Sequence, residues 1–81
     1  MENKRITELD IIAIKKIMVE KGFAKIGELA QASGISRATL RQILSGKAQP
    51  SSRIMQKLIV ALNIPQEDAG EIFFGNNLRS K

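Results

Sequence analysis

The chain has 81 residues, 43% of them hydrophobic and 26% charged, and its 13 lysines and arginines outnumber its 8 aspartates and glutamates to give a formal net charge of +5. This length and composition predict one small folded soluble domain with a modest core, and no apolar run approaches the roughly 18 residues that are needed to span a bilayer. The absence of cysteine and histidine excludes a disulfide framework, the usual zinc ligand sets and histidine-centred acid–base chemistry.

The first predicted helix begins near the amino terminus. Thr7 opens the sequence TELD, which resembles a capping box with Asp10 three residues later. Apolar residues at positions 11, 14 and 18 form its expected buried face, because they share one side of a helix. Lys21 and Gly22 close the helix, since a cation followed by glycine is typical of a helix carboxyl end.

Two further short helices are predicted on either side of a tight turn. The segment KIGELAQAS has its apolar residues on one side and ends at Gly34. Ser36 caps the next helix, RATLRQILS, which ends at Gly46. Between them, Gly34 supplies the backbone freedom of the turn and Ile35 fills the core between the two helices. This spacing predicts a helix-turn-helix over about residues 25–45.

The rest of the chain is predicted to contain two more helices and a tail. Residues 52–62 form the fourth helix, and QEDAGEIFF, after Pro65, forms the fifth, with acidic residues in its first turn. Residues 75–81 are the tail. No stretch alternates between apolar and polar residues over six positions, so no strand is expected. The predicted fold class is all-α, with five short helices in a single domain over residues 1–81.

Charge is distributed unevenly along the chain. No acidic residue occurs between Glu28 and Glu67, and all eight carboxylates lie outside that interval. A charge run is often no more than a solvated face, but one sign is missing here over nearly half of the chain, which favours a polyanionic partner. The basic residues in the interval are Arg37, Arg41, Lys47, Arg53 and Lys57.

The third predicted helix has a polar, basic face opposite its apolar one. With Arg37 at zero and about 100° per residue, Arg41 lies near 40°, Ser45 near 80°, Ala38 near 100° and Gln42 near 140°. The apolar side chains lie on the opposite side. Arginine bonds guanine through two hydrogen bonds, glutamine bonds adenine, and a small apolar side chain meets the thymine methyl group. We therefore predict that this face enters the major groove of double-stranded DNA, with its amino-terminal residues leading.

The segment LAQASGISRATLRQILSGKAQPS resembles the helix-turn-helix of the Cro/CI-type family, also called lambda-repressor-like or XRE-type. The shared pattern is LA-x-x-x-G-hydrophobic-S, then a recognition helix, then a G-K loop that ends in Pro-Ser. The sequence MQKLIVALNI is similar to the family's next helix, and the resemblance covers roughly residues 8–75. The ending EIFFGNNLR resembles small regulators of this family that phages and mobile elements of Firmicutes carry.

The resemblance implies a lambda-repressor-like DNA-binding domain, and it implies roles by position. The implied base contacts are Arg37, Ala38, Arg41 and Gln42. The implied phosphate contacts are Ser36, Thr39, Ser45, Lys47 and Arg53. Without the family pattern, the simpler interpretation of Arg37 and Arg41 is that they are ordinary solvated charges. For Gln42, the alternative to a base contact is a hydrogen bond to a neighbouring side chain.

Three features depart from the family pattern. The family usually opens its second helix with a glutamine that touches a phosphate, whereas this chain has Ile26. The recognition helix often carries a glutamate near its end, paired with an arginine of the first helix, whereas this chain has Leu44. The stretch GFAKIG is one residue longer than usual. The first replacement puts the helix-two phosphate contact in question, and packing by Leu44 must replace the glutamate–arginine pair.

A dimer surface is predicted near the carboxyl terminus. Its candidate residues are Ile72, Phe73, Phe74 and Leu78, with one of the two phenylalanines expected to close the core instead. Other apolar side chains exceed what five small helices need, and such clusters favour self-association. These additional residues are Ile12, Val19, Ile54 and Val60.

Together these features predict a sequence-specific transcriptional regulator, most simply a repressor that binds a pseudo-palindromic operator as a homodimer in the bacterial cytoplasm, associated with the nucleoid. Two alternatives stay open, namely the antitoxin of a toxin–antitoxin pair and a protein-interaction module that keeps the fold. No enzyme is expected, because the chain has no serine–base pair, metal cluster or glycine-rich phosphate loop. No cofactor, metal, small-molecule ligand or membrane partner is expected either.

Overall fold

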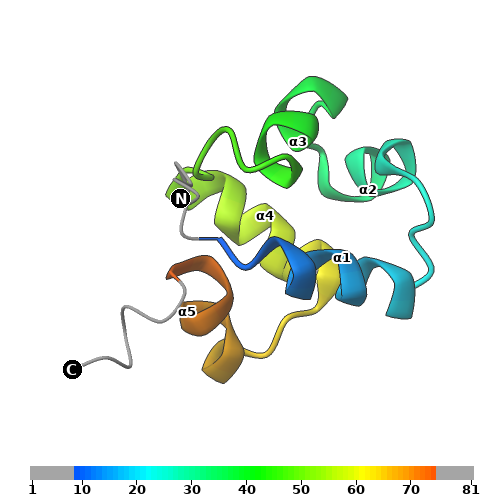
Figure 1. Ribbon diagram of the computed structural model, residues 1–81. Coiled ribbons are helices and arrows are strands. Elements are labelled where there is room, and N and C mark those ends of the chain that lie inside the picture. The colour runs from blue at the N-terminus through cyan, green and yellow to red at the C-terminus, as the bar shows by residue number, and fades with distance from the viewer. Residues whose placement is uncertain (1–8, 75–81) are drawn as a thin grey trace.

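The computed structural model describes residues 9–74, which contain five α-helices and no strand. The helices are α1 (Ile11–Glu20), α2 (Ile26–Ser33), α3 (Arg37–Leu44), α4 (Ser52–Leu62) and α5 (Gln66–Phe74). The prediction of five short helices is confirmed for this part of the chain. α2 packs against both α3 and α4, while α1 packs against α5 (Figure 1). The expected tail at residues 75–81 lies outside the described residues.

One hydrophobic core lies between the helices. Each helix contributes side chains spaced three or four residues apart, as an amphipathic helix must when it buries one stripe. Ile35, in the turn between α2 and α3, is 3% exposed and fills the core as predicted. The remaining buried side chains are Leu9, Ile14, Met18, Leu29, Leu40, Ile43, Leu44, Leu58, Leu62, Ile64, Ile72 and Phe73.

α1 begins later than the sequence predicted. Asp10 is the residue that caps the helix, and its carboxylate accepts a hydrogen bond from the backbone N–H of Ala13 at 3.1 Å. The expected helix start at Thr7 is therefore wrong, and Thr7 itself lies outside the described residues. The chain before α1 serves the core instead, because Leu9 is fully buried and the Asp10 N–H donates to the carbonyl of Ile72 in α5 at 2.7 Å.

The turn between α2 and α3 follows the predicted chemistry. Gly34 ends α2 in the left-handed conformation, with φ of 76°, and its N–H donates to the carbonyl of Ala30 at 2.9 Å. A Cβ atom at position 34 would meet nothing within 4 Å, so backbone conformation and not space selects glycine there. Ser36 then caps α3, since its Oγ accepts from the Thr39 N–H at 3.1 Å and donates to Thr39 Oγ1 at 2.9 Å.

Replacing Ser36 with alanine should lower the free energy of unfolding by about 1 kcal/mol, because the Thr39 N–H loses its acceptor at the start of α3. Urea denaturation followed by circular dichroism measures the change. Ser52→Ala is the matched control, because Ser51 and not Ser52 caps α4, and it should alter stability by less than about 0.5 kcal/mol. A Ser36→Ala chain as stable as the wild type would contradict the capping role.

The carboxyl end of α5 is held by two distant segments. Its Ile72 carbonyl accepts from Asp10 at the start of α1, and its Phe73 carbonyl accepts from Gln49 Nε2 at 3.0 Å. A helix leaves its last carbonyls without partners inside the helix, so these bonds satisfy groups that would otherwise need water. They also fix the rotation of α5 about its axis, which decides which of its side chains enter the core.

This rotation makes the candidate dimer surface smaller than the sequence predicted. Phe73 is the phenylalanine that closes the core, at 1% exposure, and Ile72 is also buried, at 9%. Both are therefore corrected from surface to core residues. Phe74 is 40% exposed, and Leu78 lies outside the described residues. Of the additional apolar residues, Ile54 packs against the core, and those left exposed are Ile12, Val19 and Val60.

Candidate nucleic-acid interface

α3 buries one side and presents the other to solvent. Leu40 and Ile43 are 0% and 2% exposed, and they anchor the helix to the core. The opposite face is open, as the helical wheel predicted. Its exposed residues are Arg37, Ala38, Arg41 and Gln42, the four that were expected to reach bases.

The residues that were expected to reach phosphates lie within α3, next to its ends in the sequence, or in α4. Ser36 precedes α3, Lys47 follows it, and Arg53 lies in the first turn of α4, all three exposed. Ser45 is exposed at the end of α3, where its hydroxyl donates to the carbonyl of Gln42 at 3.2 Å. Thr39 differs from the others, because it is only partly exposed.

The guanidinium group of Arg37 lies against the first turn of α2. A Cβ atom placed on Gly27 would be 2.9 Å from Arg37 Nη2 and 3.1 Å from its Nε, closer than such atoms normally approach. The missing side chain at position 27 therefore lets the first residue of α3 cross the start of α2. Sequence analysis missed this role of Gly27. The signal was a glycine inside a helix, which costs about 0.5–1 kcal/mol relative to alanine and so calls for a reason.

Replacing Gly27 with alanine should move Arg37 without harming the fold. The added methyl group would occupy the space of the guanidinium, while alanine in place of glycine favours the helix by about 0.5–1 kcal/mol. We expect the chain to keep or gain stability in urea, and the NMR signal of the Arg37 Nε–H group to shift. Gly34→Ala is the control, since a Cβ atom there would meet nothing within 4 Å but would strain a left-handed residue, so this change should destabilise the chain instead. An unchanged Arg37 signal in Gly27→Ala would contradict this contact.

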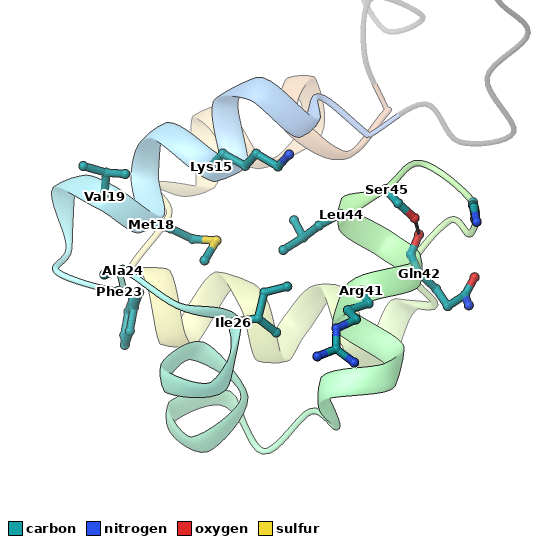
Figure 2. Close-up of a pocket in the computed structure, with 11 residues that line it drawn as sticks. Lys15, Met18, Val19, Phe23, Ala24, Ile26, Arg41, Gln42, Leu44 and Ser45 are labelled. Carbon is teal, nitrogen blue, oxygen red and sulfur yellow. Dashed lines mark hydrogen bonds between the residues drawn. The ribbon is translucent and has the colours of Figure 1, made fainter.

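The two residues that replace the family's usual glutamine and glutamate line a common groove. Ile26 at the start of α2 and Leu44 at the end of α3 line a groove of about 740 Å³, together with Met18 of α1 (Figure 2). Leu44 is 7% exposed and Met18 is 6% exposed. Apolar side chains of α1 and α3 thus line the groove at the place where the family pattern has a glutamate–arginine pair.

Positive charge surrounds this side of the molecule. Lys15, Arg41 and Lys47 all line the groove, and no carboxylate of the part of the chain that the structure describes does so. Within residues 9–74, no group of histidine, cysteine, aspartate or glutamate side chains is arranged to hold a metal ion. None of the helices described is long and apolar enough to cross a membrane. The chemistry that this surface offers is recognition of an anion by guanidinium, ammonium and amide groups.

Two short helices joined by a left-handed glycine turn, the second exposing arginine and glutamine, define a helix-turn-helix DNA-binding protein. A comparison with protein families agrees, because the helix-turn-helix family model matches residues 14–66. The chain belongs to this family, the Cro/CI-type helix-turn-helix proteins, which are DNA-binding transcriptional regulators with a lambda-repressor-like fold. No curated protein and no solved structure matches the chain.

Proposed function

We propose that the protein is a repressor that binds a pseudo-palindromic operator as a two-fold dimer, with α3 of each copy in the major groove. The observation that carries this proposal is the joint exposure of Arg37, Ala38, Arg41 and Gln42 on one face of α3. That face lies within a stretch of sequence that has no acidic residue to repel phosphates.

Sequence choice would come from the side chains of α3. Arg37 and Arg41 can each form two hydrogen bonds with a guanine, and Gln42 can do the same with an adenine. Ala38 adds a methyl group for thymine contact, and its small size permits close approach of the helix to the bases. Because the amino-terminal residues of a recognition helix reach base edges first, Arg37 and Ala38 would lie deepest in the groove.

Affinity and register would come from the residues at the ends of α3. Phosphate contacts position a protein on the duplex but carry no sequence information. Lys47 and Arg53 would supply charge, and hydroxyl groups would supply neutral hydrogen bonds. Each phosphate that is neutralised releases counterions, so the logarithm of the binding constant falls by about 0.9 for each tenfold rise in salt per phosphate. The proposed hydroxyl donors are Ser36, Thr39 and Ser45.

Repression would follow from occupancy of the promoter by the dimer. Two copies related by a two-fold axis place their recognition helices about 34–36 Å apart, one turn of B-DNA, so the two half-sites repeat at that spacing. Phe74 is the exposed phenylalanine that remains available to a second copy. We place this action in the cytoplasm of a bacterium, on the nucleoid, and a phage or mobile-element origin in Firmicutes stays a prediction.

Selection of binding sites from a pool of randomised duplexes tests the proposal. The expected result is a pseudo-palindromic site whose half-sites are centred about 10 base pairs apart. A site with a single half would contradict the dimer while leaving DNA recognition intact. A pool with no enriched sequence would contradict the proposal itself, and weak, salt-insensitive binding would favour an interaction module on the same fold.

A further inference from the structure

The groove between α1 and α3 combines an apolar floor with a basic rim. In Figure 2, the side chains of Met18, Ile26 and Leu44 approach one space from three different helices, and Lys15 extends toward it from α1. Phe23 adds an aromatic ring at one end. Arg41 lies at the opposite edge from Lys15. Among residues 9–74, lysine and arginine are thus the only ionisable side chains that line the groove.

DNA binding explains why the rim of this groove is basic, but it does not explain why the floor is apolar. A phosphate backbone binds cations and hydrogen-bond donors, and an apolar floor offers it neither. Covering phosphates with Ile26 and Leu44 would remove water from them without replacing its hydrogen bonds, which is unfavourable. A second kind of ligand, apolar on one side and anionic on the other, would satisfy both parts of the groove.

We propose that the groove binds an acidic amphipathic helix from a partner protein. Apolar residues on one face of such a helix would pack on the floor, while its carboxylates would pair with Lys15, Arg41 and Lys47. The volume of about 740 Å³ is in the range of established ligand sites. Val19 of α1 also lines the groove and is 73% exposed, so the apolar surface extends along α1 beyond the groove. This extension suits an elongated helix better than a compact small molecule.

The partner would displace operator DNA, and this consequence rests on the proposed function. Arg41 and Gln42 line the groove and also belong to the exposed face of α3. A helix seated in the groove would hold Arg41 in an ion pair and cover the approach to Gln42. The two ligands therefore compete, and an acidic partner would act as an inhibitor of the repressor.

A selection of helical peptides tests this proposal. The probe is a displayed library of peptides of about 15 residues with apolar residues on one helical face and all other positions randomised. Peptides selected on the wild-type chain should be rich in aspartate and glutamate and should release a labelled operator duplex. They should bind at least about tenfold more weakly to Ile26→Gln and to Lys15→Glu. Val60→Gln, which removes an exposed apolar residue of α4 outside the groove, should bind them like the wild type.

Three outcomes would overturn the proposal: no enriched peptide, enriched peptides that are neutral or basic, or peptides that bind both groove variants as well as the wild type. If peptides bind the groove while the operator stays bound, the claim that the two ligands compete would be contradicted. Lys15 is exposed, so Lys15→Glu keeps the test valid if Ile26→Gln fails to fold. Peptide binding is measured without DNA, and Ile26→Gln should still prefer the operator over random DNA. A failure of the proposed peptide site can therefore be distinguished from a failure of the proposed repressor function.

Discussion

Replacing both Arg37 and Arg41 with alanine should abolish the preference of the protein for its operator over random DNA. Each arginine that bonds a guanine through two hydrogen bonds supplies about 1–3 kcal/mol of discrimination. Losing both should therefore weaken binding by roughly thirtyfold to twenty-thousandfold at each half-site. Binding to random DNA should weaken much less, because the change removes only two of the 13 basic residues.

Titrations with the selected operator and with a random duplex measure this difference. The matched control is Lys16→Ala/Lys57→Ala, which removes the same charge from residues outside both α3 and the groove. The control should lower binding to both duplexes alike and keep the preference. A double arginine variant that still prefers the operator would show that α3 does not read bases.

Replacing Phe73 with alanine should lower the free energy of unfolding by about 3–5 kcal/mol. The ring is 1% exposed, so its removal exposes core surface and leaves a cavity beneath α5. Small domains are stable by only about 5–15 kcal/mol, so this single change removes a large share of the total. The hydrogen bond from Gln49 is to the backbone carbonyl of Phe73, and it does not depend on the ring.

The neighbouring residue provides the control for this change. Phe74 is 40% exposed, and Phe74→Ala should cost about 1 kcal/mol in the monomer, well below the cost at position 73. Urea denaturation at low protein concentration, followed by circular dichroism, compares the two variants. Equal losses, or a larger loss at position 74, would contradict the rotation of α5 that places Phe73 in the core.

Most helix boundaries were predictable because local chemistry sets them. The ends of α2 and α4 follow from Gly34 and Asn63, which adopt left-handed conformations, and the start of α3 follows from its serine cap. The start of α1 was not predictable in this way. Its position depends on the burial of Leu9 and on the bond between Asp10 and Ile72, which join segments far apart in the sequence.

The candidate site shows the same division between local and distant causes. Helical periodicity predicted which residues α3 exposes, because that depends on α3 alone. The contact of Arg37 with Gly27, and the groove between α1 and α3, depend on how separate helices pack, which no local pattern encodes. Likewise the sequence could not choose between Phe73 and Phe74, because the choice depends on bonds from Asp10 and Gln49 to α5.

A fluorescence-anisotropy titration of the wild-type chain tests the central claim, that this protein reads DNA sequence, most directly. The selected operator and a random duplex of equal length are compared at several salt concentrations. We predict that the operator binds about a thousandfold or more tightly than the random duplex, and that both affinities fall as salt rises. Equal affinity for the two duplexes would contradict the claim, because the basic surface would then bind DNA through its charge alone, without sequence specificity.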